Sequence, residues 1–186
     1  MIVIGITGSI ASGKTTVSKL CAEKKYPLFN ADLVVKKLYE DSKFVNKLIK
    51  TFKLSSKENI KKQIKILIEK NKSKFLVLES IIHPLVRREM NSFLKRKANL
   101  LILEIPLLIE NKLGKYFDKI IFVHARKELR LKRYLKRNND QKIFETLNKK
   151  QISAAVKKKA CDLTINNNYS LAILKRNVKK FMKKYE

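Results

Sequence analysis

Residues 2–17 read IVIGITGSIASGKTTV, and this stretch decides the fold. Residues 2–6 are apolar and rich in β-branched side chains, which is typical of a buried strand. Gly8 and Gly13 bound a short loop behind them, and apolar residues then recur at helical spacing from Val17 onward. A strand, a glycine-containing loop and a helix in this order predict a loop whose backbone N–H groups surround a phosphate group.

The loop matches the pattern G-x-x-x-x-G-K-[ST], with Gly8, Gly13, Lys14 and Thr15 in the defining places. Glycines let the backbone turn its N–H groups toward phosphate oxygens, and the helix that follows adds its positive N-terminal end. We expect Lys14 to reach the β- and γ-phosphates of a nucleotide and the hydroxyl of Thr15 to bind Mg²⁺. The pattern predicts nucleotide binding, but many unrelated chemistries share this loop.

Length and charge limit the class of protein. The chain has 186 residues, of which 45% are hydrophobic, and this is enough for one well-filled α/β domain but not for a second full domain. The formal net charge is +28, but lysines occur in nearly every predicted helix. No aromatic and basic platform accompanies this charge, so we predict no dedicated nucleic-acid partner.

Membrane attachment and disulfide bonding are also not expected. The longest apolar run, at 100–109, is short and contains Glu104 and Pro106, so we predict no membrane partner. Cys21 and Cys161 lie far apart and show no CxxC spacing, and the sequence shows no targeting segment. We predict two reduced, buried thiols in a cytoplasmic protein.

The rest of the chain alternates strand and helix signals. Four further strands are predicted, at 27–29, 100–104, 119–123 and 161–165. The alternation predicts a parallel sheet covered on both faces, with the helical segment 40–97 inserted over it. Within that segment, Ser55 and Glu58 predict a capping box that opens a helix, and His83-Pro84 predicts a break in a longer helix.

Two carboxylates are candidates for chemistry. Asp32 follows the second predicted strand, at the carboxyl end of the sheet, where open α/β folds bind ligands. A phosphoryl transfer to an alcohol uses a carboxylate near the hydroxyl, so Asp32 is a candidate general base, and a helix-capping role is an equal alternative. Glu104 ends its strand and either holds metal-bound water or is a simple strand-end carboxylate.

Four arginines form a stripe on a predicted helix, because their spacings are four, three and four: Arg126, Arg130, Arg133 and Arg137. Arg offers phosphate a fixed fork of donors that Lys lacks, and the chain otherwise prefers Lys. The stripe therefore suits a lid that closes on a transferring phosphate, with a solvated basic face as the alternative.

Histidines carry less information. His83 and Arg87 are expected on one helix face, although a lone histidine is more often structural than catalytic. His124 follows a predicted strand and is interpreted as structural. No cluster has the spacing of a zinc site, so zinc is not predicted.

The motifs together resemble the dephospho-CoA kinase family. In chain order they are GITGSIASGKTTV at 5–17, NAD at 30–32, IIHPLVR at 81–87, EIPLLIE at 104–110, ELRLKRYLKRN at 128–138, Gln151, and CDLTINN at 161–167. They extend over nearly the whole chain, and HPLVR followed by IPLLIE is a specific combination.

The resemblance implies an α/β fold, a three-layer parallel-sheet P-loop kinase. It implies one domain over 1–186 with a nucleotide-binding core, a helical acceptor-binding insertion at about 33–97 and a small lid at about 126–150. The implied reaction moves the γ-phosphoryl group of ATP, with Mg²⁺, to the ribose 3′-hydroxyl of dephospho-CoA, the last step of coenzyme A synthesis. A cytoplasmic monomer or small homo-oligomer is expected.

The resemblance also implies site residues. Asp32 would be the base, Lys14 and the lid residues Arg133 and Arg137 would take part in catalysis, and His83 and Arg87 would bind the acceptor with Asp32. The implied ATP-binding residues are Gly8, Ala11, Ser12, Gly13, Lys14, Thr15, Thr16 and Asn167, the last near the ATP base, with Thr15 as the metal ligand.

The sequence departs from the family pattern at four places. Asn30 replaces the first acid of Asp-Ala-Asp, which leaves Asp32 as the sole carboxylate of that motif. Ser9 stands where the loop usually has Gly, and we expect it to be tolerated unless a positive φ is required. Ile109 and Cys161 replace a Phe and an Ala, which are interpreted as packing changes.

Two other functions stay open from the residues alone. One is a P-loop kinase for nucleoside or nucleotide acceptors, because the segment 40–97 decides the choice of acceptor. The other is a nucleic-acid-binding NTPase, in which the high positive charge would itself be functional.

Overall fold

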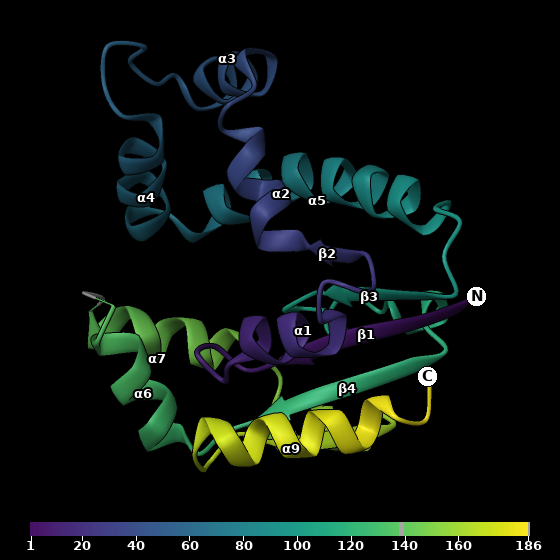
Figure 1. Cartoon of the computed structure of the whole chain (residues 1–186). Helices are drawn as coiled ribbons and strands as arrows, with labels where there is room; N and C mark the ends of the chain where they lie inside the picture. The colour runs from purple at the N-terminus through teal and green to yellow at the C-terminus, as the bar shows by residue number, and fades with distance from the viewer. Residues whose placement is uncertain (138–139, 186) are drawn as a thin grey trace. The chain divides into compact units, whose positions relative to one another are not determined.

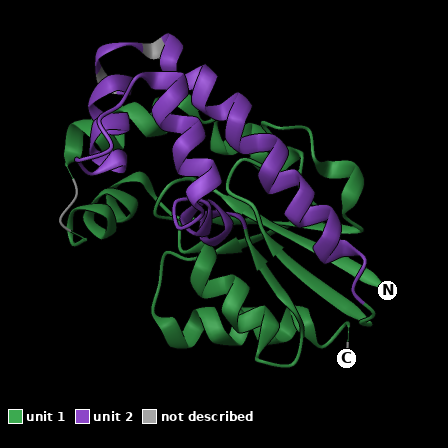
Figure 2. Cartoon of the chain, turned by 90° about the horizontal axis from the view of Figure 1, so that it is seen from above, with its two compact units in different colours: residues 1–30, 97–186 green, residues 31–96 purple. Residues whose placement is uncertain are grey.

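The computed structural model describes residues 1–137 and 140–185. They form two compact units (Figure 2): residues 1–30 with 97–186, here called the sheet unit, and residues 31–96, here called the helical unit. The functional division implied by the family resemblance, with an acceptor-binding insertion and a lid, stays a prediction.

The sheet unit contains five strands, all paired in parallel in the order β2-β3-β1-β4-β5 (Figure 1). They are β1 (Ile2–Gly8), β2 (Leu28–Asn30), β3 (Leu100–Glu104), β4 (Lys119–His124) and β5 (Leu163–Asn166). The predicted parallel sheet is confirmed, and the strand ends differ from the predicted ones by two residues at most. A central parallel strand is buried on both faces, which explains why β1 is apolar nearly throughout.

One face of the sheet is covered by α1 and α9, which pack side by side (Figure 1). The helices of the unit are α1 (Lys14–Ala22), α6 (Lys127–Leu135), α7 (Gln141–Lys150), α8 (Ala154–Lys159) and α9 (Leu171–Met182), with the short 3₁₀ helix η1 (Gly114–Tyr116). Val17 of α1 and Val178 of α9 are buried in one cluster with Ile4 and Ile121 of the sheet. This cluster fixes α1, and therefore the loop before it, on the sheet.

A segment that follows β3 lies over another part of β1. A Cβ atom at Gly5 would come within 2.7 Å of the side chain of Leu108 and 2.9 Å of that of Phe117, so only glycine fits this close approach. The same segment carries Glu110, whose Oε1 lies 2.7 Å from Nζ of Lys157 in α8. Lys157 is 0% exposed, so this ion pair ties α8 to the segment inside the protein.

The helical unit has its own core. It consists of α2 (Ala31–Leu38), α3 (Ser42–Phe52), α4 (Ile60–Lys70) and α5 (Lys72–Leu94). Its buried cluster combines side chains from α3, α4 and α5, namely Phe44, Leu48, Phe52, Ile64, Leu78 and Ile81.

Two local predictions in this unit are wrong. Ser55 does not cap a helix, because α4 is capped by Asn59, whose side chain accepts a hydrogen bond from the backbone N–H of Lys62 at 3.1 Å. Gln63 instead binds both backbone groups of Ser55, at 2.9 Å and 2.8 Å. The break at Pro84 is absent, since α5 continues through this proline. Packing of apolar residues on both sides of Pro84, such as Leu78 and Met90, offsets the missing backbone donor.

The two cysteines are free thiols in different surroundings. Cys21 is buried, and burial raises the pKa of its thiol to about 12. Cys161 is partly exposed, so its predicted burial is wrong, although desolvation still raises its pKa to about 11. Both thiols stay protonated at neutral pH, which makes them poor nucleophiles.

Within the described residues, none of the helices has both the length and the apolar character that a membrane span requires.

Candidate active site

The loop between β1 and α1 has the backbone of a phosphate-binding loop. Ala11 and Gly13 have positive φ values of 57° and 97°, and Ser9 does not, which agrees with the expected tolerance of serine there. A Cβ atom at Gly8 would lie 2.6 Å from the carbonyl oxygen of Val123 in β4, so this position requires glycine. Gly8 is therefore required for steric reasons, and Gly13 is favoured by its positive φ.

Helix α1 begins without a side-chain cap. Its N-cap residue is Gly13, which offers no side-chain acceptor to the first turn. Helix α6 likewise has no side-chain cap, whereas side chains cap the N-termini of α3, α4, α5, α7, α8 and α9. Uncapped N–H groups at a helix N-terminus, together with the helix dipole, favour an anion. This feature supports the predicted phosphate site.

Two side chains of the loop motif have defined partners. Nζ of Lys14 lies 3.2 Å from the carbonyl oxygen of Gly8 and 3.2 Å from that of Ser9, so its charge is held against the loop. The hydroxyl of Thr15 donates a hydrogen bond of 2.7 Å to Oε1 of Glu104. The side chain at the end of β3 is therefore connected directly to the phosphate loop.

Glu104 is the centre of a small polar cluster. It is 1% exposed and accepts three side-chain hydrogen bonds, one of them from Thr15. The other two reach Oε2, from the hydroxyl of Ser18 at 2.8 Å and from the amide of Asn30 at 2.6 Å. Glu104 is thus part of the loop's surroundings rather than a simple strand-end carboxylate. Ser18 was not predicted, although it lies one helical turn after Thr15.

The oxygen atoms that could bind a metal beside the loop fit Mg²⁺. They are hard oxygen atoms, the hydroxyl of Thr15 and the carboxylate of Glu104, which Mg²⁺ prefers. In the described ranges, no group of three or more His, Cys, Asp or Glu residues could hold a metal ion by itself. Mg²⁺ commonly binds one or two protein oxygens together with substrate phosphates, so these residues fit a metal that is carried by a nucleotide.

The peptide groups of Ile10, in the middle of the loop, are held from both sides. Its N–H donates a hydrogen bond of 2.9 Å to Oε1 of Gln151, and its carbonyl oxygen lies 3.4 Å from Nη1 of Arg130. Arg130 also donates to Asn148 of α7 at 2.8 Å and to the carbonyl of Ala125 at 3.1 Å. The segment with α6 and α7 is therefore bonded to the loop.

Asn167 and Arg133 contact the last part of the loop. The amide of Asn167 donates to the carbonyl oxygen of Ser12 at 2.8 Å, and a Cβ atom at Gly13 would collide with this amide. Nη2 of Arg133 donates to the carbonyl oxygen of Asn167 at 2.8 Å. These contacts place both residues at the phosphate loop, while contact of Asn167 with the ATP base stays a prediction.

The arginine stripe has two kinds of member. Arg130 is 7% exposed and binds backbone and Asn148, so it positions the loop rather than facing solvent. Arg126 and Arg137 are exposed. Sequence reasoning gave no role to Gln151 or Asn148, because their partners are distant in sequence and a lone polar residue carries no local signal.

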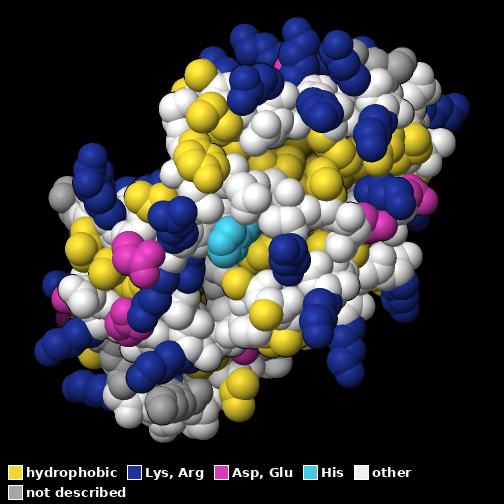
Figure 3. Space-filling view, turned by 90° about the horizontal axis from the view of Figure 1, so that it is seen from below, with side chains coloured by type: hydrophobic (Ala, Val, Ile, Leu, Met, Phe, Trp, Pro, Cys, Tyr) yellow, Lys and Arg dark blue, Asp and Glu magenta, His cyan; other side chains and the backbone are white. Residues whose placement is uncertain are grey.

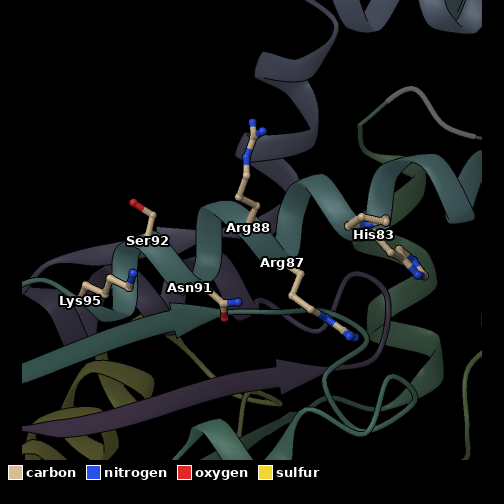
Figure 4. Close-up of a pocket in the computed structure, with 7 residues that line it drawn as sticks. His83, Arg87, Arg88, Asn91, Ser92 and Lys95 are labelled. Carbon is tan, nitrogen blue, oxygen red and sulfur yellow. The ribbon is translucent and has the colours of Figure 1, made fainter.

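The predicted acceptor residues belong to the helical unit. A pocket of about 580 Å³ is lined by α5 residues, including His83, Arg87 and Asn91. These three point to one side of α5, whereas Arg88 and Ser92 point to the other (Figure 4). Nε2 of His83 lies 3.9 Å from Oε1 of Glu79, one helical turn earlier.

Asp32 is an exposed residue in the first turn of α2. It follows Asn30 by two residues along the chain, and Asn30 contacts Glu104. The role of Asp32 as the general base stays a prediction.

A parallel sheet whose first strand leads into this loop, with Lys14 and Thr15 in their expected places, defines a P-loop nucleotide-binding protein. The model of the dephospho-CoA kinase family matches residues 2–172. The chain belongs to the dephospho-CoA kinase family.

Similar proteins match this chain over nearly their full lengths. A dephospho-CoA kinase from Fusobacterium nucleatum is 35% identical over 187 residues, covering 97% of each chain. The crystal structure of TT1252 from Thermus thermophilus superimposes with a TM-score of 0.82 at 28% identity, covering 98% of this chain and 97% of that one. The dephospho-CoA kinase structure from Campylobacter jejuni has the same fold, with a TM-score of 0.68 at 24% identity and coverage of 99% and 97%.

Proposed function

We propose that this chain transfers the γ-phosphoryl group of ATP to the ribose 3′-hydroxyl of dephospho-CoA and so forms coenzyme A. The observation that carries the proposal is the contact between Thr15 and Glu104 at an uncapped helix N-terminus. It supports a donor site for nucleotide phosphates in a chain of the dephospho-CoA kinase family.

On the donor side, the residues act by position and charge. The N–H groups of the loop and the ammonium group of Lys14 bind the β- and γ-phosphates, where negative charge shifts during transfer. Thr15 and Glu104 would hold Mg²⁺, which neutralises phosphate charge when bound. Arg133 and Arg137 would approach the transferring group from the segment at about 126–150, which we assign as the lid.

On the acceptor side, Asp32 orients the 3′-hydroxyl and takes its proton. The hydroxyl oxygen forms the new bond to the γ-phosphorus as the bond to the β–γ bridging oxygen breaks, and ADP leaves. His83 and Arg87 bind the anionic acceptor, for which the fork of an arginine is suited. The row of His83, Arg87 and Asn91 on one side of α5 supports this assignment (Figure 4).

The excess of basic residues is assigned no role in the reaction. Lysine and arginine side chains are scattered over the visible face of the molecule rather than gathered in one stripe (Figure 3). This distribution supports our proposal that nucleic acid is not a dedicated partner. We further propose that the enzyme works in the cytoplasm as a monomer or small homo-oligomer.

An acceptor panel tests the proposed function. ADP release is measured with Mg²⁺, ATP and equal concentrations of dephospho-CoA, nucleosides and nucleotides, with the folded Lys14→Ala variant as the inactive control and Lys19→Ala as the matched surface control. Turnover with dephospho-CoA well above that with every other acceptor is expected. Preference for another acceptor would favour a different small-molecule kinase. ATP hydrolysis stimulated by RNA or DNA, with a steep dependence on salt, would favour a nucleic-acid-dependent NTPase.

A further inference from the structure

We propose that the amide of Asn30 takes the place of a cation beside Glu104. The amide keeps the Glu104 carboxylate in position next to the phosphate loop without a divalent metal, and Mg²⁺ enters only with the nucleotide. Asn30 is thus a positioning residue that acts through Glu104. The proposal deepens the proposed function and rests on it only for the identity of the nucleotide-borne metal.

The contact itself identifies the amide nitrogen as the atom facing Glu104. Asn30 lies 2.6 Å from Oε2 of Glu104, the shortest of the three hydrogen bonds to this carboxylate. The donor is Nδ2 of the Asn30 amide, and the acceptor is the carboxylate oxygen. Hydrogen bonds to a charged acceptor are short and strong, as this one is.

Burial makes this donor necessary. Glu104 is 1% exposed, and a buried carboxylate is costly unless its oxygen atoms are hydrogen-bonded or paired with positive charge. Thr15 donates a hydrogen bond to Oε1, while Ser18 and Asn30 both donate to Oε2. Three neutral donors of the protein therefore satisfy both carboxylate oxygen atoms of Glu104.

An aspartate at position 30 would reverse this arrangement. The position carries an acid in the family pattern that the sequence resembles, and here it carries Asn. Two carboxylate groups at the observed separation repel each other, and a cation between them would offset this repulsion. The Asn30→Asp chain is therefore expected to create a divalent-cation site that exists before nucleotide binds.

Thermal unfolding without nucleotide tests the inference. Wild type, Asn30→Asp and the control Asn46→Asp, an exposed asparagine of α3, are compared in EDTA and in millimolar Mg²⁺. In EDTA, the Tm of Asn30→Asp should lie about 4–10 °C below wild type, and Mg²⁺ should raise it by about 5 °C. Wild type and Asn46→Asp should show the same Tm in both conditions.

Two results of this experiment would overturn the proposal. One is an Asn30→Asp chain as stable as wild type in EDTA, which would show that the amide does not compensate Glu104. The other is a destabilised variant that Mg²⁺ does not restore, which would show that Asn30 only supports the fold.

A second measurement needs no variant and keeps the proposal testable if Asn30→Asp fails to fold. Mn²⁺ is titrated into nucleotide-free wild type and followed by the EPR signal of the free ion. We expect no binding until ATP is added, and stoichiometric binding without ATP would overturn the proposal. Folded Asn30→Asp should bind Mn²⁺ without ATP at least tenfold more tightly than wild type. None of these results depends on dephospho-CoA, so failure of the proposed function in the acceptor panel would be recognised separately.

Discussion

The phosphate loop of the sheet unit and the α5 row of the helical unit differ in how their polar groups are satisfied. In the loop, the peptide groups of Ile10 and the carbonyl of Ser12 are bonded to side chains from other parts of the chain. On α5, the side chains of Arg87 and Asn91 form no hydrogen bond with the described residues. The loop geometry is set by contacts within the protein, whereas the side chains of Arg87 and Asn91 have no such contacts to orient them.

This difference predicts which kinetic parameter changes when a residue near the loop or on α5 is substituted. Donors that are already oriented stabilise charge that develops in the transition state without reorganisation. Flexible side chains instead lose rotamer freedom when the ligand binds, and their contribution appears as affinity. Changes in the loop's surroundings should therefore affect the use of ATP, and changes on α5 should affect the KM for the acceptor.

Asp32→Asn is the strongest test of this division, because Asp32 belongs to the helical unit but is assigned to the chemical step. We expect kcat to fall by about 10³–10⁴-fold, since the amide cannot take the proton of the hydroxyl, while ATP affinity stays unchanged. Glu40→Gln, at an exposed carboxylate after α2, is the control. A variant that changes only the KM for the acceptor would make Asp32 a binding residue like those of α5.

Lys157→Met tests whether the sheet unit depends on its internal polar links. The substitution leaves the largely buried carboxylate of Glu110 without its ion-pair partner, so we expect the free energy of unfolding to fall by about 3–5 kcal/mol. Denaturant unfolding measures it, and Lys158→Met, at the exposed neighbouring lysine, should stay within about 0.5 kcal/mol of wild type.

The double variant Lys157→Met/Glu110→Leu separates charge from packing. Replacing both ends of a buried pair by apolar groups is often neutral, so at least half of the lost stability should return. If the double variant is less stable than Lys157→Met alone, the buried charge was not the cause of the loss.

The sequence predicted those features that depend on neighbours along the chain. The strand predicted at 2–6, the glycines of the loop and the helix that follows it are all given by local spacing. The parallel sheet follows from the alternation of strands and helices. These elements were predictable because each one's signal is complete within a short window.

Contacts between distant segments were not predictable in the same way. Gln151 lies 141 residues from its partner Ile10, and Arg130 looks in sequence like any member of the arginine stripe. The cap of α4 was missed for a different, local reason: Ser55 and Asn59 are both good capping residues, and Asn59 caps the helix while Gln63 binds the backbone of Ser55. The partners of Gln151 and Arg130 depend on the folded chain, which local propensity does not describe.

Arg87→Ala tests whether this side chain of α5 binds the acceptor. Loss of one charge-assisted contact with an anionic acceptor should raise the KM for dephospho-CoA by about 10–100-fold, with kcat and the KM for ATP changed by less than about twofold. Initial rates at varied acceptor and ATP concentrations measure this, with the exposed Lys62→Ala of α4 as the charge-loss control. An increase in the KM for ATP instead would place Arg87 on the donor side.

Gln151→Leu gives the smallest expected effect and tests the loop most directly, because it removes one acceptor and leaves the N–H of Ile10 unpaired. We expect kcat/KM for ATP to fall by about 5–10-fold and the KM for dephospho-CoA to stay unchanged. Gln151→Glu keeps an acceptor at this position and should recover part of the loss, whereas Gln141→Leu, at an exposed glutamine of α7, should behave like wild type. If Gln151→Leu and Gln151→Glu lose activity equally, the hydrogen bond to Ile10 does not set the loop. The conclusion that contacts within the protein set the loop geometry would then be wrong.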